Sequence, residues 1–449
     1  MTRLFGTDGV RGLANVDLTA PLALELGEAA ARLTIQGRPA SGHKPKAIIG
    51  RDTRISGEFL DHALAAGLAS AGMDVVRVGV VTTPTVAHLT ASSSVDLGVM
   101  ISASHNPMPD NGIKFFAHGG YKLPDQVEDQ IQELLNTPWD RPTGAAVGEV
   151  EYDDDWAEKS YIEHLMTSLG TDLHGLRIAV DCANGGASFL APEAFRQAGA
   201  DAVVINAAPD GRNINDKAGS THPEQLQALT VASEADFGVA YDGDADRCLA
   251  VDRHGNLVDG DKIMGALAVH MRDEGQLAKD TLVVTVMSNL GLILAMQEAG
   301  IKTIQTGVGD RYVLEAMLEG GYSLGGEQSG HIIAKKYATT GDGILSSLLL
   351  ARMVKESGRD LADLTSFIKR LPQTLINVGG VDRSRANTDP AVQEAVAAAE
   401  AVLGNTGRVL LRPSGTEPLV RVMVEAATQA QADGVASRLA DVVKESLSL

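Results

Sequence analysis

The segment Leu97-Gly-Val-Met-Ile-Ser-Ala-Ser-His-Asn-Pro107 begins as an apolar run and ends in a polar loop. The apolar part predicts a buried strand, and the loop after it carries the hydroxyl of Ser104. Open α/β folds bind ligands beyond the carboxyl ends of their strands, and Pro107 prevents a helix from starting at once. We therefore expect Ser104 to take part in chemistry, although the tetrapeptide Ser104-His-Asn-Pro107 taken alone is typical of an ordinary turn. We call residues 102–107 the serine loop.

A second apolar run, residues 237–240, leads into Tyr241-Asp-Gly-Asp-Ala-Asp-Arg247. Three carboxylates at alternate positions can converge on one hard cation such as Mg²⁺ or Ca²⁺. An EF-hand is excluded, because its sixth and twelfth positions would be Arg247 and Arg253 instead of Gly and Glu. The alternative is an acidic turn that hydrogen-bonds its own backbone. We call residues 242–247 the acidic loop.

Two further loops carry polar groups. The arginine loop, Arg412-Pro-Ser-Gly-Thr-Glu-Pro418, offers a guanidinium, two hydroxyls and glycine-exposed amides, which suit a phosphate, or else it is a polar β-turn. The histidine loop, Gly325-Gly-Glu-Gln-Ser-Gly-His331, offers groups that suit sugar hydroxyls, or else it is a glycine-rich connection. A Gly-x-Gly at residues 307–309 lacks the third glycine of a dinucleotide site, so we expect a sugar contact there.

The order of these motifs along the chain resembles that of a known protein superfamily. The amino-terminal Arg3-Leu-Phe-Gly-Thr-Asp-Gly-Val-Arg-Gly12 is followed by the serine, acidic, histidine and arginine loops, in that order. This order resembles the α-D-phosphohexomutase superfamily over nearly the whole chain. The resemblance implies three similar mixed α/β/α domains and a C-terminal α+β domain like the TATA-box-binding protein, around a central cleft. We expect the domains at residues 1–155, 156–257, 258–371 and 372–449.

The resemblance also implies roles for single residues. Ser104 would be a phosphoserine in the active enzyme, and one Mg²⁺ would bind its phosphate together with Asp242, Asp244 and Asp246. Arg11 would lie near the phosphoserine, Lys114 and Arg247 would stabilise the transferring group, and His331 would move a proton. Glu327 and Ser329 would hold sugar hydroxyls. The second phosphate of the substrate would contact the residues of the C-terminal domain: Arg412, Ser414, Gly415, Thr416 and Arg421.

The amino-terminal motif and Gln328 resemble the branch of the superfamily that acts on glucosamine phosphates. The implied reaction interconverts glucosamine 6-phosphate and glucosamine 1-phosphate through a 1,6-bisphosphate, and a hexose 1,6-bisphosphate would first phosphorylate the enzyme. A mutase for glucose or mannose phosphates is the nearer alternative. A haloacid-dehalogenase-like phosphatase with Asp242 as nucleophile is the more distant one, and a sugar-phosphate sensor without catalysis the most distant.

Composition sets limits on partners and location. A chain of 449 residues is too long for one core. A formal net charge of −20 argues against a nucleic-acid partner. Cys182 and Cys248 are too few for a disulfide scaffold, and no segment resembles a signal peptide or a membrane span, so we expect a cytoplasmic protein. A homodimer is compatible with the sequence, which does not decide the oligomeric state.

Alternating strand and helix patterns predict an α/β protein. We expect strands at residues 47–50, 74–81, 96–103, 176–181, 237–240, 281–287 and 302–306, and helices at residues 57–71, 84–93, 124–135, 260–271, 391–403 and 429–447. A hairpin over residues 248–258 should turn at His254-Gly255. The acidic run at residues 149–155 indicates a boundary between domains.

Overall fold

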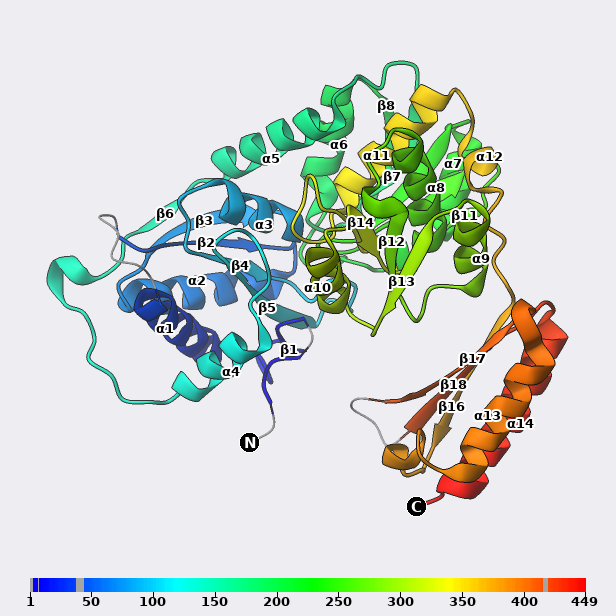
Figure 1. Cartoon of the computed structure of the whole chain (residues 1–449). Coiled ribbons are helices and arrows are strands. Elements are labelled where there is room, and N and C mark those ends of the chain that lie inside the picture. The colour runs from blue at the N-terminus through cyan, green and yellow to red at the C-terminus, as the bar shows by residue number, and fades with distance from the viewer. Residues whose placement is uncertain (1–2, 7, 38–43, 415–418) are drawn as a thin grey trace. The chain divides into compact units, whose positions relative to one another are not determined.

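The computed structural model describes residues 3–6, 8–37, 44–414 and 419–449 of the chain. It consists of two compact units, which are described here one at a time (Figure 1). The first unit comprises residues 1–287 and 301–366, and the second comprises residues 288–300 and 367–449. No helix in the described ranges is long and apolar enough to cross a membrane.

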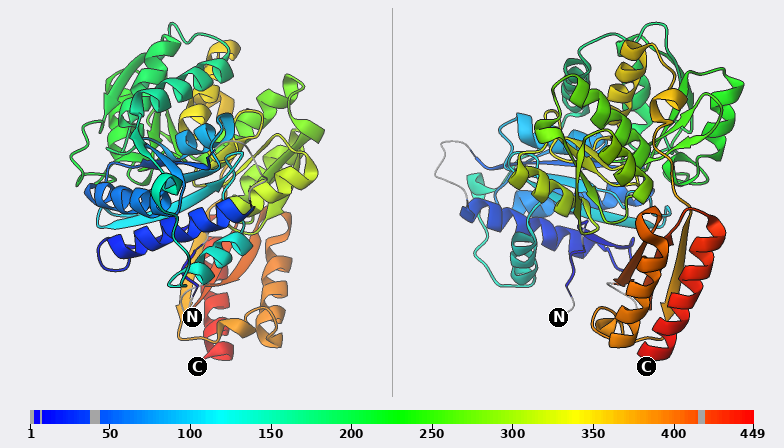
Figure 2. Two further views of the ribbon diagram at one scale, coloured as in Figure 1. Left: turned by 90° about the vertical axis from the view of Figure 1, so that its left-hand side faces the viewer. Right: turned by 45° about the vertical axis from the view of Figure 1, so that its right-hand side comes forward.

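The first sheet of the first unit has six strands. In sheet order they are β1 (Val10–Leu13), β5 (Asp110–Ala117), β4 (Leu97–Ile101), β2 (Lys46–Arg51), β3 (Asp74–Val80) and β6 (Val150–Tyr152). The helices around this sheet are α1 (Ala20–Gly37), α2 (Ile55–Ser70), α3 (Thr83–Ser92) and α4 (Asp125–Leu134). Figures 1 and 2 show α1 and α2 together on one face of it. These two helices approach closely because Gly67 faces the backbone of Leu24, where a Cβ atom would lie 2.1 Å from the carbonyl oxygen.

The second sheet has five strands. In sheet order they are β11 (Leu257–Val258), β10 (Cys248–Asp252), β9 (Phe237–Tyr241), β7 (Arg177–Asp181) and β8 (Asp201–Ile205). The helices of this part are α5 (Asp154–Leu169), α6 (Ala187–Ala198) and α7 (Glu224–Ala232).

The third sheet has four strands. In sheet order they are β13 (Lys302–Thr306), β12 (Thr281–Thr285), β14 (Leu324–Gly326) and β15 (Ile332–Ala334). The helices of this part are α8 (Gly260–Asp273), α10 (Asp310–Gly320), α11 (Gly343–Ser357) and α12 (Leu361–Thr365).

The three sheets share one topology. In each, three parallel strands are followed by an antiparallel one, giving the orders β3-β2-β4-β5, β8-β7-β9-β10 and β13-β12-β14-β15. The third parallel strand, β4, β9 or β14, is buried along its whole length. The loop that leaves this strand therefore starts from a fixed point at the carboxyl edge of the sheet. This repeated topology confirms the three similar α/β domains that the resemblance implied.

The second unit is a small α+β domain. Its antiparallel sheet has the order β16 (Gln373–Gly379), β18 (Leu419–Glu425), β17 (Arg408–Pro413), and its helices are α9 (Leu290–Glu298), α13 (Pro390–Leu403) and α14 (Gln429–Leu447). The helices α13 and α14 pack on the sheet and on each other, so both cover the same face (Figure 1). Buried Glu425 ties α9 to the sheet, since it accepts hydrogen bonds from Asn289 and from the N–H of Leu290, each at 3.0 Å.

Most of the expected elements are confirmed to within two residues at each end. The helix expected at residues 84–93 is α3, the hairpin at residues 248–258 is β10 and β11, and the helix at residues 429–447 is α14. The acidic run at residues 149–155 forms regular secondary structure, since it contains β6 and the start of α5. Asp153 caps α5 by accepting a hydrogen bond from the N–H of Trp156 at 3.1 Å, which explains why acidic residues gather there.

Candidate active site

Three of the four loops occupy the same place in their sheets. The serine loop joins β4 to β5, the acidic loop joins β9 to β10, and the histidine loop leads from β14 to β15. The first unit brings all three together. Ser104 Oγ donates a hydrogen bond to Asp242 Oδ2 at 2.6 Å, and Arg247 forms an isolated antiparallel bridge with His331.

Ser104 is buried and adopts a left-handed backbone conformation with φ of +53°. Such a conformation costs on the order of 1 kcal/mol for a residue other than glycine, so its surroundings must hold it. Its N–H donates to Ser102 Oγ at 2.9 Å, and its carbonyl accepts hydrogen bonds from Arg54 at 3.0 Å and Asn215 at 2.8 Å. These contacts aim the hydroxyl at the acidic loop.

Arg54 holds the serine loop in place through side-chain hydrogen bonds to the loop backbone. Its side chain is fully buried, pairs with Asp52 at 2.9 Å and donates to the carbonyls of Ser104, Asn106, Pro107 and Asp110. Our reading of the sequence missed this residue. The available signal was its position, since Arg54 lies in the short segment between β2 and α2, and the carboxyl ends of β2 and β4 meet at one edge of the sheet.

The acidic loop holds three buried carboxylates, Asp242, Asp244 and Asp246, with ligand atoms all within 4.8 Å of one another. Oδ1 of Asp244 and Oδ1 of Asp246 are buried and accept no hydrogen bond from the described residues. Burying charged oxygens without a hydrogen bond is costly, whereas a hard cation would use these atoms as ligands. This donor set therefore fits a divalent metal ion.

The carboxylates of the acidic loop differ in their pKa. Burial, together with the neighbouring Asp246 and Asp244, raises the pKa of Asp242 well above its ordinary value. Burial acts in the same direction on Asp244, but the Lys114 ammonium at 2.8 Å outweighs it and lowers the pKa of that carboxyl to about 2. Lys114 is itself buried, so this pair is not a surface salt bridge.

Arg247 and His105 lie beside the serine hydroxyl. Arg247 donates from Nη1 to His105 Nδ1 at 3.1 Å, and that nitrogen is 3.4 Å from Ser104 Oγ. Burial, with the charges of Arg247 and Arg11, lowers the pKa of His105, so this imidazole is neutral near pH 7. Arg11 lies on β1 opposite Gly112 and forms an ion pair with Asp8. The positive charges of Arg247 and Arg11 therefore both act on the His105 ring beside Ser104.

The histidine loop contains an imidazole with one unused nitrogen. His331 is buried, and its Nε2 accepts a hydrogen bond from the N–H of Gly341 at 3.2 Å. Its Nδ1 is buried and has no hydrogen-bond partner among the described residues. Glu327 is half-buried and accepts from the N–H of Gly309 at 3.2 Å, while Ser329 is exposed. The loop at residues 307–309 thus contacts the histidine loop itself.

The second unit holds two of the predicted basic residues side by side. Arg412 on β17 pairs in register with Arg421 on β18, which places both side chains on one face of the sheet. Burial and the charge of Arg421 lower the pKa of Arg412. Ser414 is buried, and its carbonyl accepts from Arg383. Gly415 and Thr416 lie outside the described residues.

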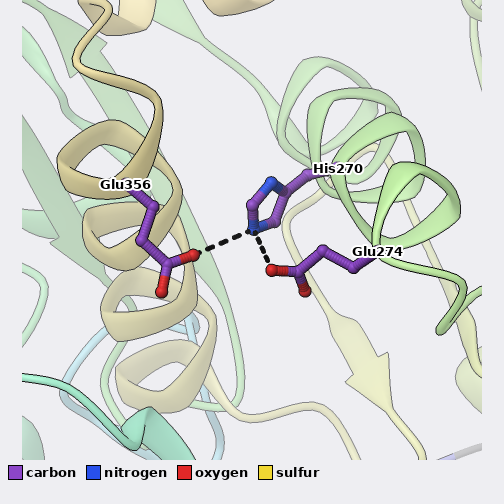
Figure 3. Close-up of side chains that lie close together, drawn as sticks. All are labelled: His270, Glu274 and Glu356. Carbon is purple, nitrogen blue, oxygen red and sulfur yellow. Dashed lines mark ion pairs between the residues drawn. The ribbon is translucent and has the colours of Figure 1, made fainter.

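A second group with metal-ligand atoms lies outside the three loops. His270 on α8 and Glu274, the residue after this helix, face Glu356 on α11, and the His270 Nε2 is 3.6 Å from each carboxylate (Figure 3). Arg352 already pairs with Glu274 at 3.2 Å and with Glu356 at 2.9 Å. Because a guanidinium neutralises these partly exposed carboxylates, the acidic loop is the better candidate for a metal ion.

Comparisons with known proteins identify the family of the chain. Models of the phosphoglucomutase/phosphomannomutase family match along the chain: α/β/α domain I at residues 2–140, domain II at 159–255, domain III at 259–371 and the C-terminal domain at 375–442. The phosphoglucosamine mutase of Bifidobacterium animalis subsp. lactis is 60% identical, and the match covers 100% of both chains.

Solved structures share the fold. A phosphoglucomutase/phosphomannomutase family protein from Burkholderia thailandensis has a TM-score of 0.81 at 26% identity, covering 99% of this chain and 98% of that one. An Aspergillus fumigatus N-acetylphosphoglucosamine mutase, solved with GlcNAc-6P and magnesium, has a TM-score of 0.70 at 20% identity, covering 99% of this chain and 96% of that one, and shows the fold alone. The serine, acidic and histidine loops, the matched domain models and the full-length relatives together show that the chain belongs to the phosphoglucosamine mutase family of the α-D-phosphohexomutase superfamily.

Proposed function

We infer that the chain interconverts glucosamine 6-phosphate and glucosamine 1-phosphate. The observation that carries this inference is the hydrogen bond from Ser104 Oγ to Asp242, which joins a nucleophilic hydroxyl to a buried set of metal ligands. A relative that is 60% identical over its full length is named a phosphoglucosamine mutase, which supports the choice of substrate.

The acidic loop would hold one Mg²⁺ between Asp242, Asp244, Asp246 and a phosphate oxygen on Ser104. When bound, the ion acts as a Lewis acid and offsets negative charge on the phosphoryl group. Magnesium is the ion in the Aspergillus structure, and the orphaned oxygens of Asp244 and Asp246 support its placement here.

In the first half-reaction, phosphorylated Ser104 gives its PO₃ group to the free hydroxyl of the sugar phosphate. The bond between phosphorus and Ser104 Oγ breaks, a bond to the sugar oxygen forms, and the hydroxyl proton passes to a base. The imidazole of His331, whose lone pair lies on Nε2 in the tautomer that accepts from the N–H of Gly341, is our candidate for that base. Lys114 and Arg247 would stabilise the equatorial oxygens of the transferring group, and Arg11 the phosphoserine.

The product of this step is a 1,6-bisphosphate and unmodified Ser104. After the sugar reverses its orientation, the other phosphate returns to Ser104, so each cycle ends with the serine phosphorylated again. Glu327 and Ser329 would hold the 3- and 4-hydroxyls in both orientations. Arg412, Arg421 and Ser414, with Gly415 and Thr416, would hold whichever phosphate is not reacting. A hexose 1,6-bisphosphate would prime the enzyme by phosphorylating Ser104.

The domain boundaries at residues 155, 257 and 371 are part of the same proposal. The ranges of the four matched domain models support them, because each of the three boundaries falls in or beside a gap between models.

The test is a coupled assay that compares kcat/KM for glucosamine, glucose and mannose 6-phosphates with catalytic glucose 1,6-bisphosphate and Mg²⁺. We expect the highest value for glucosamine 6-phosphate and no turnover after a chelator has removed the metal. A higher kcat/KM for glucose or mannose 6-phosphate would replace the substrate with a neutral hexose phosphate. Release of inorganic phosphate without isomerisation would favour the phosphatase.

A further inference from the structure

An unbroken series of alternating charges links the acidic loop to the histidine loop. Asp244 pairs with Lys114 at 2.8 Å, Lys114 with Asp8 at 3.1 Å, and Asp8 with Lys122 at 2.6 Å. Lys122 then pairs with Asp310 at 2.5 Å, and Asp310 Oδ2 is 3.6 Å from His331 Nε2. The series passes from the second sheet through residues of the first sheet to the third.

Lys122 lies at the centre of this series. Its ammonium contacts two carboxylates that come from distant parts of the chain, Asp8 in the amino-terminal segment and Asp310 at the first position of α10. The side chains of Lys122 and Asp310 are only 12% and 15% exposed, so water screens their attraction much less than that of a surface pair. Burial opposes ionisation of all three groups, but their mutual charges outweigh it: the pKa of Lys122 is raised and those of Asp8 and Asp310 are lowered.

The segment that contains Asp310 also supports the histidine loop. The N–H of Gly309 donates to Glu327 Oε1 at 3.2 Å, one residue before the Asp310 carboxylate that faces His331. Gly309 has φ of +131°, a conformation that favours glycine, so this turn is shaped to present its N–H to Glu327. Next to it, Arg311 donates to the carbonyl of Leu123 at 2.9 Å, which ties the same segment to residues beside Lys122.

We propose that Lys122 and Asp310 are positioning residues: their ion pair fixes the start of α10 against the first sheet and so holds Glu327 and His331 in register with Ser104 and the acidic loop. Neither residue touches the reacting atoms in this role. Without the ammonium of Lys122, Asp310 would lose this ion pair and would be repelled by the carboxylate of Asp8, which Lys114 and Arg11 would still pair. The start of α10 would then move, and the histidine loop with it.

The test combines hydrogen exchange with steady-state kinetics on the full chain. The variants are Lys122→Met, which keeps the apolar stem, Lys122→Arg, which keeps the charge, and Asp310→Asn. Lys279→Met is the matched control, since Lys279 is exposed, donates to the carbonyl of Gly320, lies over the ring of Tyr322 and has no ion pair in the described part of the chain. Peptides with the N–H groups of Gly309 and Gly341 report the contacts to Glu327 and His331 directly, without any substrate.

We expect about tenfold faster exchange of these peptides in Lys122→Met and Asp310→Asn, and unchanged exchange in Lys279→Met. The kinetic arm rests on the proposed function. There kcat should fall by about 10- to 100-fold, more than KM rises, because misplaced groups cost rate. Lys122→Arg should recover most of kcat. The double variant should be no slower than the slower single variant, because both substitutions break the same contact.

Exchange and kcat within twofold of the wild type in Lys122→Met would overturn the proposal, and so would a double variant whose loss is the product of the two single losses. If Lys122→Met does not fold, Asp310→Asn decides by the same criteria. A wild-type enzyme without activity on hexosamine phosphates would refute the proposed function alone, and the exchange data would still decide the role of Lys122.

Discussion

The acidic loop of the first unit and the arginine pair of the second unit, Arg412 and Arg421, differ in whether opposite charges surround them. The carboxylates of Asp242, Asp244 and Asp246 are buried and face fixed cations, among them Lys114 and Arg247. Arg412 and Arg421 lie opposite each other with like charge, and neither pairs with a carboxylate in the described part of the chain. In the proposed mechanism the first site is pre-organised for a metal and a phosphoryl group, whereas the two arginines would be neutralised by the phosphate of the substrate.

The largest expected effect is at the pre-organised site. Ser104→Ala removes the group that carries the phosphoryl, so turnover should fall by at least about 10³-fold. The melting temperature should stay close to that of the wild type, because only one hydrogen bond, to Asp242, is lost. The coupled assay and a thermal melt measure the two quantities. Turnover within tenfold of the wild type would remove Ser104 from the mechanism.

The hydrogen bonds of Arg54 to the serine loop should matter for stability. Arg54→Met leaves the buried Asp52 without its ion-pair partner and removes a hydrogen-bond donor from the carbonyls of residues 104, 106, 107 and 110, so the free energy of unfolding should fall by about 3–5 kcal/mol. Arg196→Met, which breaks an exposed pair with Glu193 on α6, is the control and should cost less than about 1 kcal/mol. Equal losses in urea denaturation would contradict a pre-organised serine loop.

The arginine pair should show the reverse pattern, with function lost and stability kept. Arg421→Met should raise KM for the sugar phosphate by about tenfold or more, since a hydrogen bond to a charged group contributes about 1.5–3 kcal/mol. Stability should be unchanged or slightly higher, because like charges opposite each other on a sheet are destabilising. Calorimetry and kinetics would separate the two effects.

The control for that variant lies on the same sheet. Arg408→Met breaks the 2.6 Å pair with buried Glu425 and should lower the melting temperature while leaving KM close to the wild-type value. If Arg421→Met were the destabilising variant and Arg408→Met the one with raised KM, the contrast between the two sites would be wrong.

The smallest expected effect is a pH dependence of the free energy of unfolding of the first unit, which contains His88. Burial, together with neighbouring His164, lowers the pKa of His88 to about 4, and the two rings stack at 4.3 Å. The folded state therefore favours neutral His88. Its contribution to stability is full above pH 6.5 and is lost as the pH falls towards 4, on the order of 1–2 kcal/mol between pH 7 and pH 5. The second unit contains no histidine.

Tryptophan fluorescence can follow this effect, because Trp139 and Trp156 are the two tryptophans of the chain and both lie in the first unit. The urea midpoint should fall between pH 7 and pH 5 in the wild type and fall less in His88→Leu. An identical fall in both proteins would show that other groups control the pH dependence.

The sequence was sufficient for the parts of the site that follow directly after strands. Ser104, Asp242 and His331 stand in polar loops that the sequence singled out, and the structure brings these loops together. Lys122 and Asp310 could not be predicted in the same way, since 188 positions separate them and only the tertiary fold makes them neighbours. The common topology of the three sheets was predicted from the family resemblance alone and not from the strand pattern, because the loops and helices between the strands differ in length.

The most direct measurement is the location of the phosphoryl group. The protein would be incubated with Mg²⁺ and with glucose 1,6-bisphosphate that carries a label in its phosphoryl groups. It would then be digested, and the labelled residue would be identified by mass spectrometry. We predict label on Ser104 in the wild type and none on any residue of Ser104→Ala. Label on Asp242, or label that persists in Ser104→Ala, would contradict the role of the serine loop as phosphoryl carrier.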